Sequence, residues 1–253
     1  MRCLVGFFGI TRSLPHTIGS IRTHVLAPLR ASGIAVATAG HFNLPGTWTN
    51  PRSGEVGITP DRCDAALLDL DVCQVEPQSD AMIADELAAI RAVPDPYGDG
   101  YRSLTNLCHQ LRSLNRLWSL LRLFGPGPGD LVLLLRPDLL YLDRLEPARD
   151  LGLLTAGKAD LIVPAWQSWG GLNDRFAFCT VRTARAYATR LRLLSEACQV
   201  LGGMHPEIFL RVIAAWHGMR VGLTELRAVR VRGDGRVAPN DRSMLSAAAD
   251  VVA

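Results

Sequence analysis

The first 39 residues constrain the fold more than any other part of the chain. An apolar run from Cys3 to Gly9 is typical of a buried strand, and it ends in a polar turn. Residues 15–31 then repeat apolar side chains at helical spacing, and Gly33 follows as a helix-ending glycine. A second apolar run covers residues 34–39. A strand, a helix and a strand in this order predict a βαβ unit, with parallel strands joined by a right-handed crossover.

The rest of the chain extends this pattern. We expect further strands at 64–71, 131–135, 161–164 and 229–232, helices at 79–91, 101–124, 183–200 and 206–217, and a loop over 41–62. Hydrophobic residues make up 48% of the chain and charged residues 20%, which is enough apolar material for a large core. The sequence therefore predicts one α/β domain over residues 1–246, with a mostly parallel mixed central sheet flanked by helices. Residues 247–253 are expected to be a terminal tail.

Several classes of protein are disfavoured by composition and spacing. No basic run alternates with aromatic residues, so we expect no nucleic-acid partner. The six cysteines form no CxxC pair, which is typical of free thiols in a reducing compartment. No apolar stretch approaches the roughly 20 residues that a membrane span needs, and the first residues do not suit a signal peptide. We therefore expect a cytoplasmic protein. Neither a dinucleotide fingerprint nor a GxxxxGK[ST] phosphate loop is present.

Polar side chains follow two of the predicted strands. Arg136-Pro137-Asp138 comes directly after the strand at 131–135, and the strand at 161–164 leads into a loop that ends in Asn173-Asp174-Arg175. Ligands of open α/β sheets bind at the carboxyl ends of strands, and polar groups between buried segments are costly unless they are bonded. We interpret both blocks as parts of an active site. A single aspartate at a strand exit also serves as a helix or turn cap, so Asp138 alone has little specificity.

Other candidate residues also have a purely structural interpretation. Asn106 and Gln110 share a polar face of the helix at 101–124, and that face either meets solvent or lines a site. Trp166 and Trp169 suit contact with sugar rings, or they cover the core. Glu207 suits general base catalysis, and also the dipole of the helix that begins at Pro206.

The order of these segments resembles bacterial glycosyltransferases of the GT-A type, which use nucleotide sugars in polysaccharide and lipopolysaccharide assembly. The resemblance rests on the FFGITRS start, the N-x-x-x-Q helix, the LLLRPDLLY strand and the P-x-W-x-x-W-G-G-x-N-D-R-F-A block. It covers most of residues 1–210, and only the last block is specific. It implies a Rossmann-like α/β sandwich that transfers a sugar from a nucleotide-sugar donor to a glycan, lipid-linked or small-molecule acceptor.

The resemblance also implies roles for individual residues. Nucleotide contacts are expected from Gly9, Thr11, Arg12, Asn106, Gln110 and Arg136, with Glu55 in the long loop as a contact to ribose or base. The sugars are expected to meet Trp166, Trp169, Gly171, Asn173 and Arg175, with Asp174 as first choice for the catalytic carboxylate and Glu207 as second. Asp138 and His205 would hold Mn²⁺ or Mg²⁺. One departure matters: the usual D-x-D is Arg136-Pro137-Asp138 here, so Arg136 is an alternative direct ligand of the diphosphate.

Two other functions stay open at this point. A catalytically inactive nucleotide-binding α/β protein would also retain such a core, and Arg136 favours that alternative. A nucleotidyltransferase would share the sheet but usually has a lysine-bearing phosphate loop, and residues 8–13 contain no lysine. A lipid-linked acceptor would imply peripheral membrane association, although no basic amphipathic helix requires it. No feature of the sequence indicates an oligomeric state.

Overall fold

A seven-stranded sheet forms the centre of the computed structural model, which describes residues 1–50 and 54–245. Its strand order is β10-β8-β9-β6-β1-β2-β5. The strands are β1 (Arg2–Gly9), β2 (Ala35–Leu44), β5 (Val72–Pro77), β6 (Leu131–Leu135), β8 (Leu161–Pro164), β9 (Phe176–Thr180) and β10 (Val221–Thr224). Only β9 within this sheet runs antiparallel to its neighbours. The predicted α/β class with a mostly parallel mixed sheet is confirmed, and the predicted tail at 247–253 lies outside the described residues.

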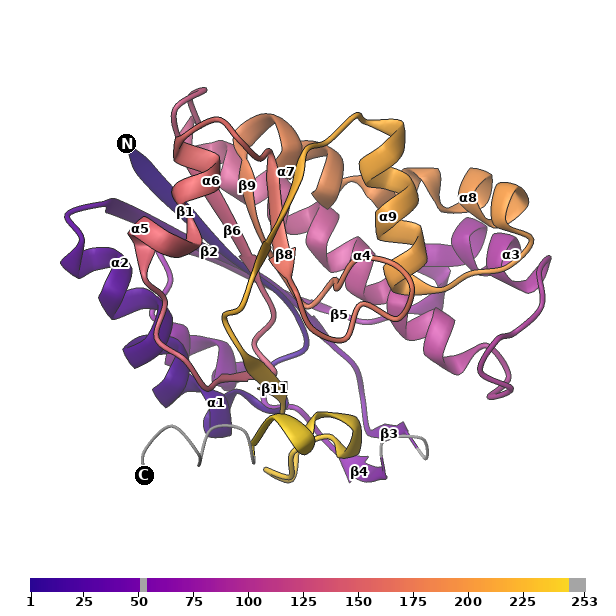
Figure 1. Ribbon diagram of the computed structural model, residues 1–253. Coiled ribbons are helices and arrows are strands. Elements are labelled where there is room, and N and C mark those ends of the chain that lie inside the picture. The colour runs from indigo at the N-terminus through magenta and orange to yellow at the C-terminus, as the bar shows by residue number, and fades with distance from the viewer. Residues whose placement is uncertain (51–53, 246–253) are drawn as a thin grey trace.

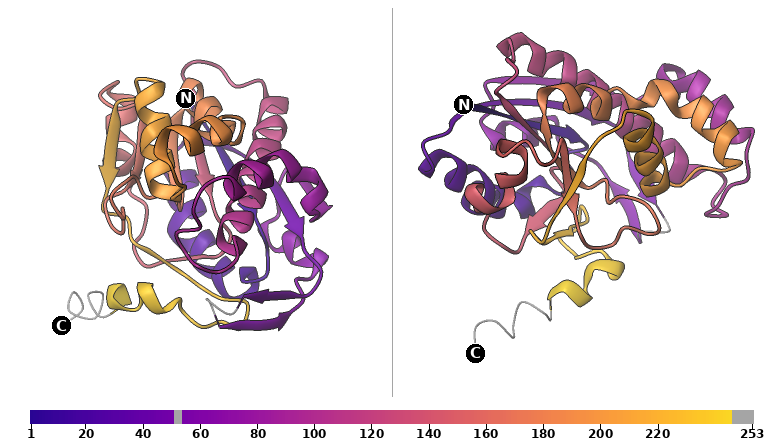
Figure 2. Two further views of the ribbon diagram at one scale, coloured as in Figure 1. Left: turned by 90° about the vertical axis from the view of Figure 1, so that its right-hand side faces the viewer. Right: turned by 45° about the horizontal axis from the view of Figure 1, so that its top comes forward.

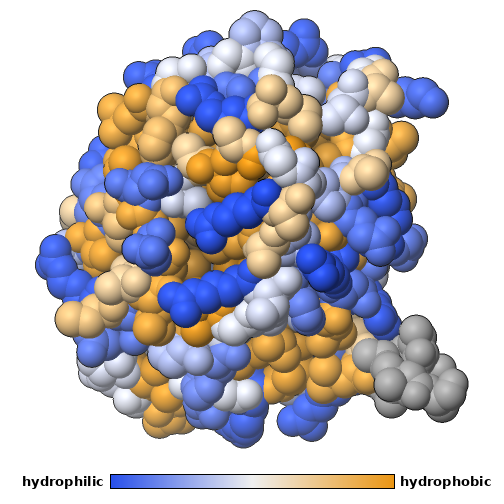
Figure 3. Space-filling view, turned by 90° about the vertical axis from the view of Figure 1, so that its left-hand side faces the viewer, coloured by the Kyte–Doolittle hydropathy of each residue, from blue (hydrophilic) through white to orange (hydrophobic). Residues whose placement is uncertain are grey.

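Helices cover both faces of this sheet (Figures 1 and 2). One layer contains α1 (Leu14–Ser20), the π-helical η1 (Ile21–Leu26), α2 (Ala27–Ala31), the 3-10 helix η3 (Arg62–Leu68), α5 (Pro147–Asp150) and α6 (Gly152–Thr155). The other contains η4 (Asp80–Ile83), α3 (Ala84–Arg91), α4 (Arg102–Leu121) with η5 (Arg122–Phe124), α7 (Val181–Ala188), η6 (Arg190–Leu193), α8 (Leu194–Leu201) and α9 (Pro206–Trp216). The first layer also forms much of the face in Figure 3, where hydrophilic and hydrophobic residues are mixed.

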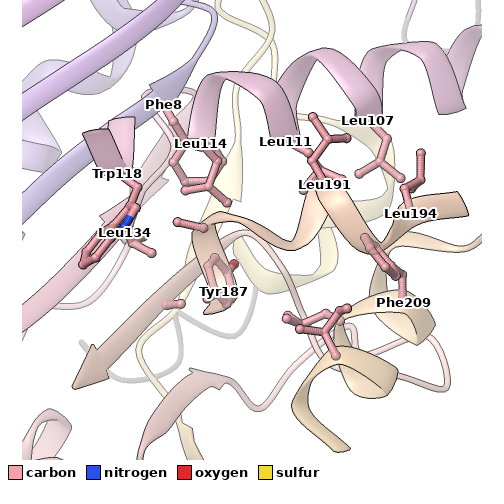
Figure 4. Packing of buried hydrophobic residues seen from close by; sticks show 14 of the residues in the cluster. Phe8, Leu107, Leu111, Leu114, Trp118, Leu134, Tyr187, Leu191, Leu194 and Phe209 are labelled. Atoms are coloured by element: carbon pink, nitrogen blue, oxygen red, sulfur yellow. The ribbon is translucent and has the colours of Figure 1, made fainter. Parts of the chain in front are cut away.

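The period of two along the strands divides the apolar side chains between two cores. Leu4 and Phe8 of β1 pack with the layer that contains α4, whereas Val5 and Phe7 pack with the layer that contains α1. In the α4 layer the predicted leucine stripe of the long helix is buried, and Figure 4 shows it packed against residues of α7, η6, α8 and α9. The sheet is therefore buried on both faces, as parallel sheets generally are.

Two small antiparallel sheets lie beside the main one. The first pairs β7 (Leu139–Tyr141) with β11 (Ala228–Arg230), close to the strand predicted at 229–232. The second pairs β3 (Trp48–Asn50) with β4 (Glu55–Ile58). The prediction of a loop over 41–62 was therefore wrong in part. β2 continues to Leu44 because β5 pairs with it up to Pro77, and the hairpin follows.

The strand predicted at 64–71 was also wrong, because this segment forms the helix η3 instead. Asp61 caps that helix, its carboxylate accepting a hydrogen bond from the Cys63 backbone N–H at 2.8 Å. Asp69 ends it with a left-handed backbone, φ 50°, and the strand β5 begins only at Val72. A capping aspartate competes with extended structure because its side chain satisfies a free N–H at the helix start.

The helix predicted over 183–200 is broken at Thr189, between α7 and η6. The Thr189 hydroxyl donates to the Arg185 carbonyl at 2.9 Å, a bond that often accompanies a bend in a helix. The break turns Arg190 inward, so that its side chain is only 1% exposed. The six cysteines are free, as predicted. Among the described residues no helix has the length and apolar character to cross a bilayer.

Candidate functional site

Three turns meet at one edge of the central sheet because of the strand register. β1 pairs in parallel with β6, with Phe7 opposite Leu135, and β9 pairs antiparallel with β6, with Leu135 opposite Phe176. The end of β1, the end of β6 and the start of β9 therefore lie together. The segments after Gly9, after Leu135 and before Phe176 are those that carry the predicted site residues, so the convergence expected from the sequence is present.

A cavity of about 560 Å³ lies at this edge, and three kinds of polar side chain line it. The cationic side chains are Arg12, Arg136, Arg175, Arg230 and Arg232. The carboxylates are Asp138, Asp174 and Glu207. Amide and aromatic groups complete the wall, among them Asn43, Trp48, Gln78, Asn106, His109, Gln110, Tyr97, Trp169 and His205. A concave site with convergent charged groups of both signs is typical of a ligand-binding or active site.

Arg136 and Asp138 form a two-point ion pair in the cavity wall. Arg136 Nε donates to Asp138 Oδ1 at 2.9 Å, and Nη2 donates to Oδ2 at 2.7 Å. Burial alone would raise the pKa of Asp138, but the guanidinium of Arg136 holds it well below its usual value. Both carboxylate oxygens of Asp138 are thus engaged by a cation of the protein itself.

The backbone of this turn is fixed from two sides. The Thr17 hydroxyl of α1 donates to the Pro137 carbonyl at 2.6 Å, and the Val231 N–H donates to the Asp138 carbonyl at 2.8 Å. The Ser13 hydroxyl in turn donates to the Val231 carbonyl at 2.7 Å. The ion pair therefore sits on a turn that is held by segments remote in the sequence.

Arg12 reaches the cavity from the turn after β1 and pairs with Glu55. Arg12 Nε lies 2.7 Å from Glu55 Oε1, and its guanidinium lies over the Trp48 ring at 4.9 Å. Glu55 is only 1% exposed and also accepts the Gly233 N–H at 3.0 Å. Arg232 Nη1 lies 3.8 Å from its other oxygen. Glu55 thus joins the hairpin to two arginines of the cavity wall and is not itself in the lining.

Arg175 and Arg230 share Asp241. Arg230 binds this carboxylate at two points, 3.0 Å and 2.9 Å, and Arg175 Nη2 lies 3.2 Å from Oδ1. Arg175 also donates to Gln167 Oε1 and lies over the Trp166 ring at 5.0 Å. Burial, and then the charge of Arg230, lower the pKa of Arg175 to about 10. Its Nη1 is buried and has no hydrogen-bond partner in the described part of the chain.

The predicted metal ligands do not fit a metal site as they are placed. Asp138 and His205 both line the cavity, but both oxygens of Asp138 accept from Arg136. His205 Nδ1 lies 3.1 Å from Glu207 Oε2. Within residues 1–50 and 54–245, no group of three or more His, Cys, Asp or Glu side chains could hold a metal ion. Hard divalent cations take several oxygen ligands, and an arginine-bound carboxylate offers little to them.

The loop between β8 and β9 is held by its own side chains. Asn173 Nδ2 donates to the Trp166 carbonyl at 2.6 Å, and its Oδ1 accepts from the Arg175 N–H at 3.0 Å. Trp166 Nε1 donates to the Leu226 carbonyl at 3.0 Å. Asn173 and Trp166 are not in the cavity lining. Their predicted contacts with sugar stay predictions, whereas the bonds seen here give both a role in shaping the loop.

Gly171 allows this loop to touch the start of α9. A Cβ atom at this position would lie 2.0 Å from the Glu207 carbonyl oxygen. The next residue, Leu172, donates its N–H to that same carbonyl at 2.9 Å. Gly171 lies outside the cavity lining, so its observed role is to allow a close backbone approach that positions Glu207.

Trp169 differs from Trp166 because it lies in the cavity lining and is 54% exposed. Its backbone is left-handed, φ 45°, as is that of Gln167, φ 50°. A bulky residue in this conformation is strained, and such strain is common at functional sites. The exposed indole thus offers a flat apolar surface at the mouth of the cavity.

Asp174 and Glu207, the first and second choices for the catalytic carboxylate, both line the cavity. Asp174 is 6% exposed, and its Oδ2 lies 4.0 Å from Arg190 Nη2. Burial, and then the charge of Asp174, raise the pKa of Glu207 to about 7. A carboxyl group with this pKa can exchange a proton near neutral pH.

Neutral polar side chains form another part of the lining, here called the neutral wall. Asn43 is 1% exposed and donates to the His109 carbonyl at 2.9 Å, but its Oδ1 has no partner in the described part of the chain. The same holds for Trp48 Nε1, Gln78 Oε1 and Gln110 Nε2. Buried polar atoms are nearly always bonded to protein, water or ligand, so these four atoms offer hydrogen-bonding positions to water or to a polar ligand in the cavity.

The polar face predicted for the long helix divides into two parts. Asn106 and Gln110 line the cavity, as the second of the two alternatives predicted. Ser113 is fully buried and its Oγ accepts the Gly9 N–H at 2.9 Å, which fixes the end of β1 beside the cavity. Gly9 is in the lining, whereas Thr11 is buried and its carbonyl accepts the Leu14 N–H at the start of α1.

Sequence reasoning missed several residues of the site. Arg230 and Arg232 had a usable signal, because both fall in the strand predicted at 229–232 and residues two apart on a strand point to the same side. Both line the cavity, although β11 itself ends at Arg230. Asn43 was missed because residues 41–62 were predicted to be a loop, whereas β2 continues to Leu44. Gln78 was missed because β5, which ends at Pro77 just before it, was not predicted. Arg190 gave no signal at all, since an arginine in a helical stretch normally faces solvent.

Comparisons with known proteins were made by sequence and by structure. No family model matches the chain, and no curated protein sequence matches it. Among solved structures, mouse xyloside xylosyltransferase 1 in its apo form matches with 14% identity and a TM-score of 0.40, over 88% of this chain and 84% of that one. The galactosyltransferase LgtC, in complex with donor and acceptor sugar analogs, matches with 13% identity and a TM-score of 0.47, over 88% and 73%. Likenesses this remote carry no residue role or substrate over to this chain.

Proposed function

We propose that the cavity binds a nucleotide sugar and that the protein transfers the sugar to an acceptor hydroxyl. The observation that carries the proposal is the arrangement of the cavity. Five arginines, a pair of carboxylates and several unpaired neutral polar groups line one space of about 560 Å³ at the carboxyl edge of the sheet. The arginines suit the diphosphate of such a donor, the carboxylates suit its reacting sugar, and the neutral polar groups suit its nucleoside.

The five arginines of the lining, here called the cationic wall, suit a diphosphate. Its five arginines pair with three carboxylates, those of Glu55, Asp138 and Asp241, which leaves two more cations than anions. Each phosphodiester group carries one negative charge. Guanidinium groups bind phosphate oxygens at two points and stay charged at any ordinary pH. We therefore propose that arginines, with Arg136 at the centre, stabilise the leaving diphosphate in place of a metal held by Asp138.

The neutral wall suits the nucleoside. A nucleobase and a ribose both present hydrogen-bond donors and acceptors, and the unpaired atoms of Asn43, Gln78, Gln110 and Trp48 include both kinds. The terminal amides can also exchange the two roles by a flip of the side chain. Asn106 and Gln110, which we expected at the nucleotide, belong to this wall.

The carboxylates suit the transfer step. The bond between the anomeric carbon and the diphosphate oxygen breaks, and its electron pair leaves with the diphosphate. The acceptor oxygen forms the new bond to the same carbon, and we propose that its proton passes to Glu207. Glu207 replaces Asp174 as first choice because its raised pKa suits proton exchange. The exposed Trp169 ring would stack against a ring of a glycan, lipid-linked or small-molecule acceptor.

Turnover is expected to follow the ionisation of Glu207. With a panel of nucleotide sugars and simple glycan acceptors, the rate of transfer or hydrolysis should rise as the pH passes through about 7, because the base must be deprotonated. Glu207→Gln should lower the rate by about 100-fold or more and abolish this limb of the profile. Glu196→Gln, an exposed carboxylate of α8, is the control. A pH profile that is unchanged in Glu207→Gln would rule out this role.

One observation favours a second candidate, a nucleotide-binding protein without catalysis. Asp138 is engaged by Arg136 and does not serve a metal in this arrangement. The same panel separates the candidates, because such a protein would bind a nucleotide and release no sugar from any donor. Release of pyrophosphate would instead indicate a nucleotidyltransferase.

A further inference from the structure

Two arginines of the cationic wall share one buried carboxylate, which comes from the C-terminal segment. Asp241 is fully buried and accepts from Arg230 at 3.0 Å and 2.9 Å and from Arg175 at 3.2 Å. Arg230 gives its Nε and Nη2 to this carboxylate, which leaves its Nη1 outside the pair. Arg175 is 4% exposed, and its Nη1 is buried without a hydrogen-bond partner in the described residues. These three side chains, here called the Asp241 cluster, carry one positive charge in excess.

A second pair of arginines is arranged in the same way around Glu55. Arg12 donates its Nε and Nη2 to this buried carboxylate at 2.7 Å and 3.5 Å, and Arg232 Nη1 lies 3.8 Å from Oε2. The Nε of Arg232 is buried and has no hydrogen-bond partner in the part of the chain that the structure describes. These three side chains, here called the Glu55 cluster, also carry one positive charge in excess.

The two clusters lie beside the turn that carries Asp138. Arg230 belongs to the first cluster and Arg232 to the second. The residue between them, Val231, donates its N–H to the Asp138 carbonyl at 2.8 Å. The two-point pair of Arg136 with Asp138 has no net charge. The two excess charges of the cationic wall are therefore divided between the two clusters, with the neutral pair next to both.

The two clusters border different parts of the cavity lining. The Arg12 guanidinium lies over the Trp48 ring at 4.9 Å, and Trp48 belongs to the neutral wall. Arg175 directly follows Asp174 in the chain, and both line the cavity. The Glu55 cluster is thus next to the groups proposed for the nucleoside, and the Asp241 cluster is next to the carboxylates proposed for the sugar.

We propose that the two clusters are two phosphate subsites, and that Glu55 and Asp241 are the positioning residues that build them. The Asp241 cluster takes the phosphate bonded to the sugar, and the Glu55 cluster takes the phosphate bonded to the nucleoside. Each phosphodiester group carries one negative charge, which matches the one excess positive charge of a cluster. A buried carboxylate between two guanidinium groups offsets their repulsion and fixes the direction of the nitrogens that it does not bind. This inference rests on the proposed function for the identity of the ligand.

The test is a calorimetric titration with a nucleoside diphosphate and with the monophosphate of the same nucleoside, both in EDTA. UDP, GDP, CDP and dTDP are compared on the wild type, and the one that binds most tightly is used. Asp241→Asn should weaken the diphosphate by about tenfold or more, because two guanidinium groups lose the carboxylate that orders them. The monophosphate should bind as in the wild type, because it occupies the Glu55 cluster. Net charge alone predicts tighter binding of the diphosphate, since this variant makes the cavity more positive.

Two further variants and two controls complete the test. Glu55→Gln should weaken the monophosphate and the diphosphate alike, because both occupy its cluster. Arg230→Gln keeps the buried carboxylate, and should weaken the diphosphate selectively even where Asp241→Asn fails to fold. Asp234→Asn and Arg227→Gln are the controls, since Asp234 is exposed on the same segment and Arg227 lies outside the cavity lining. Both controls should bind the two nucleotides as the wild type does.

Equal losses of both nucleotides in Asp241→Asn and in Arg230→Gln would overturn the proposal, because a purely structural role would act in this way. Tighter binding of the diphosphate by Asp241→Asn would also overturn it, since the carboxylate would then compete with the ligand. In both cases the wild type still binds a nucleotide, so the proposed function stands. A wild type that binds no nucleotide at all would instead refute the proposed function, and the two phosphate subsites with it.

Discussion

Arg136→Met is expected to lower the free energy of unfolding by about 3–5 kcal/mol, because it leaves a buried carboxylate without its partner. Asp138 is 4% exposed, and both of its oxygens accept from Arg136. Denaturant unfolding measures the loss. Arg116→Met is the matched control, since Arg116 is 44% exposed in its pair with Glu76 and its removal should cost at most about 1 kcal/mol.

The double variant Arg136→Met/Asp138→Leu separates stability from ligand binding. Replacing a buried ion pair by apolar side chains is often neutral for stability, so the double variant should regain most of the loss. It should not regain affinity for a nucleoside diphosphate, because the central guanidinium of the proposed phosphate wall is gone. An Arg136→Met protein as stable as the wild type, or a double variant that binds nucleotide normally, would contradict this account of the pair.

Gly171→Ala is the second change with a large expected effect. The added Cβ would lie 2.0 Å from the Glu207 carbonyl oxygen, which is backbone and cannot rotate away. Overpacking of this kind costs about 1–3 kcal/mol and sometimes more. The loop must move away from the start of α9, and Glu207 loses the bond that Leu172 makes to its carbonyl. A displacement of about 1 Å at a catalytic group lowers turnover by about 100-fold.

Gly203→Ala is the control for this prediction, because a Cβ there meets no atom within 4 Å on the segment that leads into α9. It should leave both stability and turnover near wild type. Thermal unfolding and the rate of donor turnover are measured for both variants. If Gly171→Ala kept wild-type turnover, the close contact between this loop and α9 would have no part in placing Glu207.

The parts of the fold that the sequence predicted are those set by local patterns. The βαβ start, β6 and β8 are apolar runs of strand length, and the stripe of α4 has an unmistakable helical period. The segments that failed were decided by other forces. Asp61 caps a helix where a strand was expected, and pairing with β5 extends β2 beyond the predicted end at residue 39.

The residues of the candidate site also divide into those that local patterns predict and those that contacts with distant segments decide. Arg136, Asp138, Asp174 and Arg175 could be predicted to meet, because strand ends converge at one edge of a sheet. Asp241 as the partner of Arg175 and Arg190 as the partner of Asp174 could not be predicted, because an ion pair between distant residues leaves no trace in one sequence. Arg230 and Arg232 come from the C-terminal strand region, and Arg190 is buried by a helix break. Glu55, expected at the ribose or base, instead pairs with Arg12 inside the protein.

The most direct test of the central claim is nucleotide binding by the wild-type protein in the presence of a chelator. UDP, GDP, CMP and dTDP are added in turn, each with EDTA and then with Mn²⁺, and the thermal unfolding of the protein is followed. We expect one nucleoside diphosphate to stabilise the protein in EDTA, by about 2.7 kcal/mol at 100 times its Kd, with little change on adding Mn²⁺. Absence of stabilisation by any nucleotide, or stabilisation only with Mn²⁺, would contradict an arginine-lined nucleotide-sugar site.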